Sequence, residues 1–249
     1  MIKASLHSIE TMGLVDGPGI RTVFFLQGCP LRCLYCHNPD SQHFMGENTI
    51  DAKQVVELAN RYRAYYRASG GGVTFSGGEP LMQGAFLVEA LRALKNQDIH
   101  TCIDTSGYGV SKYYKNIFEL TDIFLLDVKH VDAKAHERLT GRPIEGIVAF
   151  IKALKKFNGK IIIRHVMLQG ETDDFDSMKK LLKMISPIKN KVEKIEILPY
   201  RKNGIEKYTQ LNMIDPLLGV PPMSPEQACR FEQWINEQHS TQKERQIAV

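Results

Sequence analysis

Residues 28–38 read Gly28-Cys29-Pro30-Leu31-Arg32-Cys33-Leu34-Tyr35-Cys36-His37-Asn38 and hold three of the five cysteines of the chain, spaced C-x3-C-x2-C. Soft sulfur donors gathered in one short loop select zinc, copper(I) or an iron–sulfur cluster. A structural zinc ion and a four-iron cluster held by protein alone usually take four protein ligands. Three thiolates therefore leave one metal position open, and an open position is where chemistry takes place. A zinc site completed by His37, or buried cysteines without a metal, is the alternative.

The other two cysteines, Cys102 and Cys229, stand alone in the sequence, and we expect inert thiols there. The odd cysteine count and the clustered spacing argue against a disulfide framework. No apolar run is long enough to span a bilayer, and the first residues lack the apolar core of a secretion signal. We therefore expect a cytoplasmic protein with reduced thiols and no membrane partner.

The composition is that of an ordinary globular protein. The 249 residues can bury a sizeable core, and we expect one domain over residues 1–249. The formal charge is +4 and the pI is about 8.7, which would help docking to an acidic partner. Because the basic residues are scattered and form no patch, we expect no nucleic-acid binding.

Strand, turn and helix alternate along most of the chain. The pattern predicts strands at residues 21–27, 73–75, 99–104, 123–129, 160–167 and 192–198, and helices at residues 51–68, 81–95, 111–120, 147–157 and 175–185. About six βα units predict an α/β fold with a parallel, mostly buried sheet, closed or partly closed into a barrel over about residues 20–200. An irregular segment over residues 199–225 and a final helix over residues 225–237 follow, and we expect the last ten residues to fray.

Two glycine turns offer candidate binding sites. Asp16 and Arg21 flank the turn Gly17-Pro18-Gly19, whose main chain can approach a ligand or a partner closely. The turn Ser76-Gly77-Gly78-Glu79-Pro80 exposes main-chain groups to a small ligand, and Glu79 adds an acceptor for a cationic amine. Ordinary tight turns without a ligand are the alternative in both places.

Charged residues mark the strands that follow. Asp104 and Asp127 each end a predicted strand, and Lys129 lies two residues beyond Asp127. Arg164 interrupts an apolar run, so it needs a partner, either an anionic ligand or one of the two aspartates. Helix caps and ion pairs are the alternative for all of them.

Taken together, these motifs resemble the radical S-adenosylmethionine (SAM) superfamily, which combines the cysteine loop with a Gly-Gly-Glu-Pro turn. Within it the chain resembles the activases of glycyl radical enzymes over about residues 5–200. The resemblance rests on VDGPGIR at residues 15–21, QGC at 27–29, LYCHN at 34–38, GGVT at 71–74, SGGE at 76–79 and LPY at 198–200. It implies a partial (β/α)6 barrel, open at one side, with N- and C-terminal extensions.

The resemblance also implies two cofactors. Cys29, Cys33 and Cys36 would ligate a 4Fe–4S cluster whose open iron takes the amino and carboxylate groups of SAM. The residues implied around SAM are Tyr35, Cys36, His37, Gly77, Gly78, Glu79, Asp104, Asp127, Val128, Lys129, Arg164 and Arg201. A monovalent cation is implied beside Asp104, Thr105, the Leu125 carbonyl and Asp127.

Two stretches depart from the form usual in the family. The residue after LPY is usually a histidine near the nucleoside, but here it is Arg201, which can still donate to a ribose or a carboxylate. Residues 202–220 also differ from the usual form. These departures affect the expected contact with the nucleoside and the expected recognition of the partner.

The implied activity is an oxidoreductase reaction of anaerobic glucose metabolism, carried out on a partner protein. The reduced cluster would cleave SAM to methionine and a 5′-deoxyadenosyl radical, which takes a hydrogen atom from a glycine Cα, and Asp16 would grip the glycine loop. The partner implied is a glycyl radical enzyme, and the lack of cysteines between Cys36 and Ser76 favours pyruvate formate-lyase. We expect flavodoxin or ferredoxin as electron donor, and a monomer. A radical SAM enzyme acting on a small molecule is the alternative.

Overall fold

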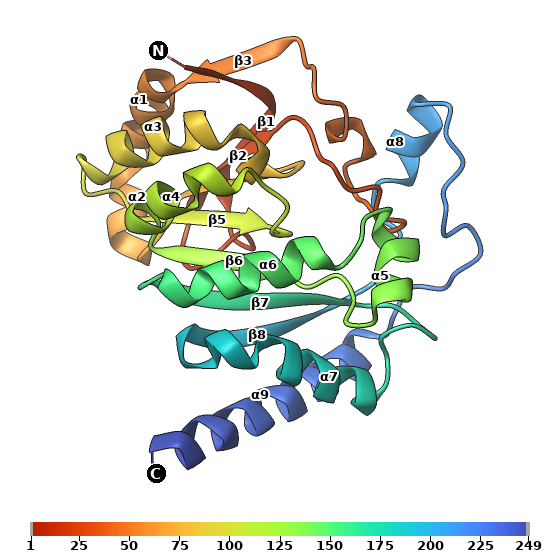
Figure 1. Cartoon of the computed structure of the whole chain (residues 1–249). Helices are drawn as coiled ribbons and strands as arrows, with labels where there is room; N and C mark the ends of the chain where they lie inside the picture. The colour runs from red at the N-terminus through yellow and green to blue at the C-terminus, as the bar shows by residue number, and fades with distance from the viewer. Residues whose placement is uncertain (1, 248–249) are drawn as a thin grey trace. The chain divides into compact units, whose positions relative to one another are not determined.

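The computed structural model describes residues 2–247 of the chain (Figure 1). The chain divides into two compact units. Unit 1 comprises Met1–Pro30, Ser41–Leu125 and Lys156–Lys160, and unit 2 comprises Leu31–Asp40, Leu126–Lys155 and Ile161–Val249. The division falls within the cysteine loop and within strand β6 (Ile123–Asp127), so both units contain part of each.

Unit 1 is built on strands in the order β3-β1-β2-β4-β5-β6. The bounds are β1 Lys3–Gly13, β2 Arg21–Leu26, β3 Asn48–Asp51, β4 Gly72–Gly77 and β5 Thr101–Thr105. Strands β2, β4 and β5 run parallel, as the βα pattern predicts. β1 is antiparallel to β2 and β3, and the sequence pattern predicts neither β1 nor β3. A register shift between Leu6 and Ser8 interrupts the two-residue alternation of β1, and β3 is short.

The helices of unit 1 pack with α3 next to both α1 and α4 (Figure 1). Their bounds are α1 Ala52–Arg61, α2 Arg63–Ser69, α3 Gly84–Lys95 and α4 Tyr114–Leu120, with 3-10 turns η2 Pro80–Gln83 and η3 Ser111–Tyr113. The single helix predicted over residues 51–68 is two helices, which meet at Tyr62. A capping box between Asp51 and Gln54 starts α1, and Gly70 ends α2 in the left-handed conformation.

The two faces of the parallel strands in unit 1 differ in chemistry. Phe24 stacks on Phe75 with ring centroids 5.7 Å apart, and Phe75 meets Phe86 of α3 edge-on, so this face packs on the helices. Side chains alternate along a strand, which places Arg21, Thr74, Ser76, Cys102 and Asp104 on the opposite face. The same face also carries Val23 and Phe25. A parallel sheet covered on both faces is apolar on both, so the polar groups among these residues indicate a site.

Unit 2 continues the βα pattern. β6 neighbours β7 (Lys160–Met167), which runs parallel to β8 (Val192–Pro199). The helices are α5 Ala133–Thr140, α6 Glu145–Ala153, α7 Phe175–Ile185, α8 Ile205–Gln210 and α9 Pro225–Ile247, with 3-10 turns η4 Leu154–Lys156 and η5 Ser186–Lys191. The strand over residues 160–167 and the helix over residues 175–185 have the predicted bounds. The sequence pattern predicts neither α5 nor α8.

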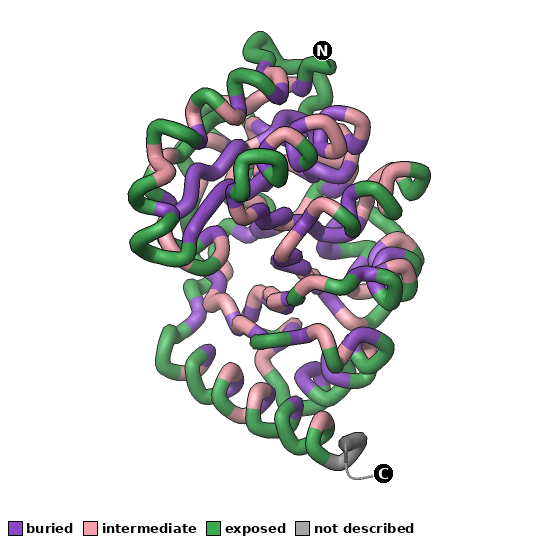
Figure 2. Tube along the Cα trace, turned by 90° about the vertical axis from the view of Figure 1, so that its left-hand side faces the viewer, coloured by how far each residue is buried: buried purple, intermediate pink, exposed green. Residues whose placement is uncertain are grey.

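Helix α9 lies along β8, the last strand in the order (Figure 1). Figure 2 shows exposed and buried positions alternating along α9. The buried positions are Ala228, Phe231, Ile235 and His239, which recur at helical spacing and so share one side of the helix. The prediction that this helix ends at residue 237 and then frays is wrong, because the helix continues to Ile247. His239 and Lys243, both beyond the predicted end, bind the Val192 carbonyl. Residues 248–249 lie outside the described residues.

Side chains of α9 also bind the main chain of β8. Asn236 Oδ1 accepts from the Ile195 N–H at 3.0 Å, and Asn236 Nδ2 donates to the Ile195 carbonyl at 2.7 Å. Glu232 Oε2 accepts from the Ile197 N–H at 2.9 Å. A strand at the edge of a sheet leaves such groups unpaired, and here α9 satisfies them.

The strand order β3-β1-β2-β4-β5-β6-β7-β8 is linear, with β3 and β8 at its ends. The sheet is therefore open and mostly parallel, which confirms the prediction of an α/β fold of the partial-barrel type. β1 with β3 and α9 are the two terminal extensions. The single-domain organisation stays a prediction. Across residues 2–247 no helix combines the length and apolar character needed to cross a membrane.

Candidate active site

The cysteine loop is held by main-chain hydrogen bonds in each unit. In unit 1 the Cys29 N–H donates to the Gln42 carbonyl at 3.2 Å. In unit 2 the Arg32 and Leu34 N–H groups donate to the last turn of α5, at the carbonyls of Thr140 and Leu139. Helix α5, which the sequence pattern does not predict, therefore fixes the middle of the loop.

The three loop cysteines differ from the other two in exposure. Cys29, Cys33 and Cys36 are half-buried, whereas Cys102 is buried and Cys229 is exposed. Burial raises the pKa of the Cys33 thiol to about 12, against the opposing effect of the Lys129 charge. Such a thiol stays protonated until a metal takes the place of the proton.

The donor set of the loop fits an iron–sulfur cluster. Three sulfur atoms within eight residues, partly shielded from water, are the ligand type that iron–sulfur clusters use. Among residues 2–247, no three side chains of His, Cys, Asp or Glu stand in an arrangement that could hold a metal ion. Metal ligands take up their final geometry together with the metal, so the chemistry of the donors is the relevant test.

The Gly-Gly-Glu turn follows β4 and packs on the end of β2. The Gly78 N–H donates to the Leu26 carbonyl and the Glu79 N–H to the Gly28 carbonyl, both at 2.8 Å. Gly77 has a φ of 114°, and a Cβ there would lie 2.3 Å from the Leu26 nitrogen. The turn thus needs glycine for close packing against the start of the cysteine loop.

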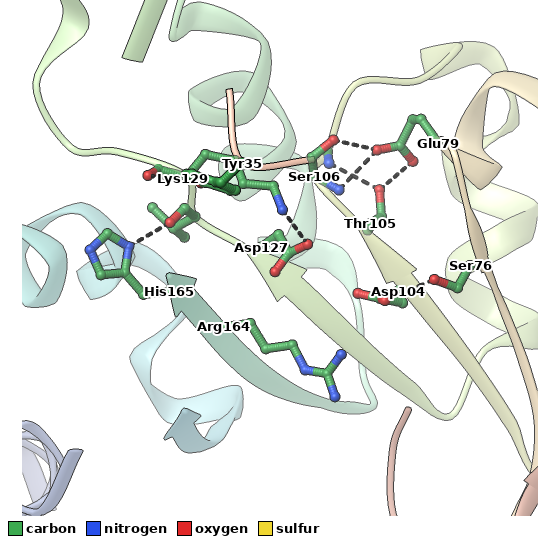
Figure 3. A network of polar contacts seen from close by, with 12 residues as sticks. Tyr35, Ser76, Glu79, Asp104, Thr105, Ser106, Asp127, Lys129, Arg164 and His165 are labelled. Carbon is green, nitrogen blue, oxygen red and sulfur yellow. Dashed lines mark hydrogen bonds and ion pairs between the residues drawn. The ribbon is translucent and has the colours of Figure 1, made fainter. Parts of the chain in front are cut away.

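Glu79 is 1% exposed and anchors the turn after β5 (Figure 3). Its Oε1 accepts from Thr105 Oγ1 at 2.5 Å and from the Leu81 N–H at 3.1 Å, and its Oε2 accepts from the Ser106 N–H at 2.8 Å and Oγ at 2.6 Å. Burial raises the pKa of Glu79, and the hydrogen bonds from Ser106 and Thr105 oppose this shift. Four donors fill the acceptor sites of a carboxylate, so a ligand amine would have to share one of them.

Asp104 and Asp16 both belong to the polar side of unit 1. Asp104 Oδ2 accepts from Ser76 Oγ at 2.9 Å (Figure 3). The Asp16 carbonyl accepts from Thr74 Oγ1 at 2.7 Å. Leu125, whose carbonyl is a predicted cation ligand, is fully buried in β6. Ser106, which the sequence pattern does not single out, joins Glu79 because it follows the β5 strand end directly.

In unit 2 the end of β6 carries an ion pair beside Tyr35. Lys129 Nζ lies 2.7 Å from Asp127 Oδ2 (Figure 3) and 5.8 Å from the centre of the Tyr35 ring. Burial alone would lower the pKa of Lys129, but Asp127, Tyr35 and Cys33 raise it well above its ordinary value. The structure thus brings three of the predicted SAM residues together around one fixed positive charge.

Strand β7 fixes the main chain of Val128, which lies between Asp127 and Lys129 in the sequence. The Val128 N–H donates to the Arg164 carbonyl at 2.9 Å, and His165 Nδ1 donates to the Val128 carbonyl at 2.6 Å (Figure 3). Burial lowers the pKa of His165 to about 4, so the ring is neutral. Arg164 Nε donates to Glu196 Oε2 at 3.1 Å, across the β7–β8 register. The sequence pattern singles out neither His165 nor Glu196, because both depend on which strands pair.

The segment after LPY contacts the end of the cysteine loop. His37 Nε2 donates to the Arg201 carbonyl at 3.3 Å, so Arg201 contacts His37 through its main chain while its side chain is exposed. Lys207 of α8 donates to Asn38 at 2.7 Å and lies 3.1 Å from Asp40. Residues 202–220, expected to be irregular, therefore contain a helix that is tied to this loop. Together with Tyr35 and His37, side chains of this segment line a small cavity.

Comparisons with known proteins agree with this fold and site. The family model described as the radical SAM superfamily matches residues 23–182, which include the cysteine loop and the Gly-Gly-Glu turn. The fold and the site thus define a radical SAM enzyme. The chain is 46% identical over 237 residues to the pyruvate formate-lyase-activating enzyme of Clostridium pasteurianum. The alignment covers 95% of this chain and 99% of the relative. The chain is 42% identical to the pyruvate formate-lyase-activating enzyme of Staphylococcus epidermidis, covering 95% of this chain and 96% of the relative. The chain belongs to the family of pyruvate formate-lyase-activating enzymes.

Solved structures agree at the level of the fold. The crystal structure of a domain of pyruvate-formate lyase-activating enzyme from Bacteroides vulgatus matches with a TM-score of 0.56 and 24% identity, covering 69% of this chain and 96% of that one. The crystal structure of Streptococcus suis SuiB bound to precursor peptide SuiA matches with a TM-score of 0.66 and 16% identity. The match covers 89% of this chain and 46% of the SuiB chain. The family membership favours the iron–sulfur interpretation of the three cysteines over structural zinc. The cofactors of the family are a 4Fe–4S cluster and SAM.

Proposed function

We propose that this chain activates pyruvate formate-lyase by generating a glycyl radical on it. The observation that carries the proposal is the 46% identity to an activating enzyme over 99% of that enzyme's length. The alternatives are activation of another glycyl radical enzyme and radical chemistry on a small molecule.

In this proposal Cys29, Cys33 and Cys36 hold the cluster. When bound, the reduced cluster supplies the electron that cleaves SAM to methionine and a 5′-deoxyadenosyl radical, which abstracts hydrogen from a glycine Cα. The protein binds the groups, fixes their orientation and keeps water away. The half-buried thiols and the neutral, buried Tyr35 beside them support this role.

The residues of unit 1 would receive the methionine end of SAM and a cation. The turn Gly77–Glu79 is fixed from both sides, so its main-chain groups keep one position for an amine. Glu79 acts chiefly by holding this turn against Thr105 and Ser106. Asp104, Thr105 and the Leu125 carbonyl, together with Asp127, would supply hard oxygen donors to a monovalent cation.

The residues of unit 2 would receive the carboxylate and the nucleoside of SAM. Lys129, held by Asp127, offers a positive charge in a fixed place. The main chain of Val128 is held by hydrogen bonds from β7. Tyr35 and His37 would border the adenine, and the Arg201 carbonyl would help to position His37. Arg164, paired with Glu196, would complete the charge around the ligand.

The remaining parts of the proposal concern partners. Asp16 would bind the glycine loop of the partner enzyme, and flavodoxin or ferredoxin would deliver the electron. The positive net charge supports docking of an acidic electron carrier. A monomeric state and a location in the cytoplasm, where such carriers are found, belong to the same proposal.

The proposal is tested by anaerobic reconstitution with iron and sulfide, then reduction with dithionite in the presence of SAM and pyruvate formate-lyase. We expect visible cluster absorption and a glycyl-radical doublet in the electron paramagnetic resonance spectrum. Alanine variants of Cys29, Cys33 and Cys36 should lose both signals. Cys229→Ala is the matched control, because this thiol is exposed and stands outside the loop, and it should keep both.

Two results would contradict the proposal in different ways. SAM cleavage without a radical on pyruvate formate-lyase would remove the partner assignment and leave the superfamily chemistry. A cluster that assembles in all three loop variants would remove the assignment of the ligands.

A further inference from the structure

Arg21, the first residue of β2, is a charged side chain with no exposed surface. Its Nε donates to Thr74 Oγ1 at 2.6 Å, its Nη1 to the Pro18 carbonyl at 3.0 Å and its Nη2 to the Val73 carbonyl at 2.7 Å. Burial lowers the pKa of Arg21 below its ordinary value. Removing a guanidinium from water costs several kcal/mol, and an apolar side chain of similar size often fills such a position at lower cost. Stability alone therefore does not account for an arginine here.

Arg21 holds the turn Asp16–Gly19. It binds the Pro18 carbonyl directly, and Thr74, which accepts from Arg21, donates its own hydroxyl proton to the Asp16 carbonyl at 2.7 Å. A Cβ on Gly17 would lie 3.1 Å from Arg21 Cδ, so the turn wraps around the arginine side chain. Two carbonyls of the turn are thereby tied to one buried cation and to β4.

The end of the turn is confined as well. Gly19 has a φ of 69°, and a Cβ there would lie 2.4 Å from the main-chain nitrogen of Gly71. The next residue, Ile20, donates its N–H to Ser69 Oγ at 2.8 Å. The turn is therefore held in one conformation before any partner binds, which lowers the entropic cost of binding.

The turn lies on the polar face of unit 1. A Cβ on Gly17 would lie 3.4 Å from the sulfur of Cys102, which precedes Asp104 by two residues on the same face of β5. Two residues of a strand span about 7 Å. The residues just before the turn, Leu14 and Val15, are 72% and 75% exposed. A rigid main chain and exposed apolar side chains thus lie within a short distance of a predicted cofactor residue.

We propose that Arg21 is a positioning residue for the protein substrate. It fixes the main chain of Asp16–Gly19 so that this turn binds the glycine loop of the partner enzyme, and it takes no part in SAM cleavage. Glycines in the turn let a second main chain approach closely, and peptide loops are bound through such fixed main-chain groups. This inference rests on the proposed function.

The test uses four variants of the full chain, each reconstituted with iron and sulfide. Arg21→Met removes the donors at similar volume. Thr74→Val removes the hydroxyl that reaches Asp16 while Arg21 stays in place, and Thr74→Ser keeps that hydroxyl. Phe86→Leu, in the core between α3 and the sheet, controls for a general loss of stability.

Two rates are measured: SAM cleavage under dithionite without a partner, and glycyl-radical formation as the concentration of pyruvate formate-lyase is varied. We expect Arg21→Met and Thr74→Val to raise KM for the partner by about tenfold or more. SAM cleavage without the partner should change by less than about twofold, as for an independent site. Thr74→Ser and Phe86→Leu should keep the wild-type KM.

Each remaining outcome overturns the inference. An unchanged KM for the partner in Thr74→Val would show that Arg21 does not act through the turn. A rise in KM in Phe86→Leu as large as that in Arg21→Met would show the same. If Arg21→Met does not fold, the result for Thr74→Val decides between these outcomes. Loss of SAM cleavage in Arg21→Met places Arg21 at the cofactor instead. A wild-type enzyme that cleaves SAM but forms no glycyl radical refutes the proposed function, and the inference with it.

Discussion

Lys129 and Asp127 form an ion pair that is largely withdrawn from water, with side chains 16% and 20% exposed. Removing two charges from water costs free energy, and the attraction between the two charges offsets that cost only while both are present. Lys179 and Asp176 form a pair of similar length, 3.0 Å, but their side chains are 64% and 77% exposed. The two pairs therefore separate the effect of burial from the effect of distance.

Lys129→Met should lower the free energy of unfolding by about 3 kcal/mol, because it leaves the largely buried Asp127 carboxylate without its partner. Lys179→Met should change it by less than about 1 kcal/mol, as exposed pairs do. Urea unfolding of both variants, followed by circular dichroism, measures the difference. Equal losses in the two variants would show that burial of the Lys129 pair has no energetic role.

Residues whose role depends on near neighbours in sequence are predictable, and residues recruited from distant strands are not. Cys29, Cys33 and Cys36 are recognised by spacing within one loop. Glu196 and His165 enter the site region because β7 pairs with β8 and follows β6 in the sheet. Nothing in the sequence around Arg164 says that its partner lies 32 residues further along the chain.

At the scale of elements, the bounds are predictable where a local stop signal exists. Helix α7 begins after Asp174, whose side chain accepts from the Ser177 N–H at 2.8 Å and from its Oγ at 2.6 Å, and its predicted bounds agree with the structure. Helix α9 has no such signal at its end, and its length follows from packing along β8. The strand β1 cannot be recognised in the sequence, because a bulge interrupts the alternation of its side chains.

The cap of α7 makes a pH-dependent contribution to stability. The hydrogen bond from Ser177 is the main cause that lowers the pKa of Asp174 below 3.8. The stabilisation is therefore present above the ordinary pKa and is lost as the pH falls through the lowered one. Asp174→Ala should cost about 1 kcal/mol at neutral pH, and the difference from wild type should shrink as the pH falls below about 4.

Asp174→Asn is the matched variant, because asparagine caps a helix about as well as aspartate and does not titrate in this range. Urea unfolding at a series of pH values compares the three proteins. An Asp174→Ala difference that stays constant down to the lowest pH would contradict the role of the ionised cap.

At the scale of the whole molecule, the two ends of the strand order limit pairing with another chain in different ways. The strand β3 at one end is only four residues long. The strand β8 at the other end has its main chain bound by Asn236 and Glu232 of α9. Short or covered edges are how native sheets avoid edge-to-edge association.

We therefore expect the chain to sediment as a monomer of 28.2 kDa. Asn236→Leu removes the hydrogen bonds to Ile195 without shortening the helix, and it should produce concentration-dependent association because β8 becomes available. Gln233→Leu, on the exposed side of the same helix, is the matched control and should stay monomeric. Sedimentation velocity at several concentrations measures this, and a monomeric Asn236→Leu would show that α9 shields β8 by bulk alone.

The contact between Asn236 and Ile195 has a wider consequence. The carboxamide of Asn236 offers one C=O and one N–H, the same two groups that a peptide unit of an added strand would offer. Helix α9 thus imitates, with one side chain, the first link of a ninth strand. At the β8 end, the growth of the sheet is therefore stopped by a side chain of the same chain, at the main-chain groups of Ile195 that an added strand would need.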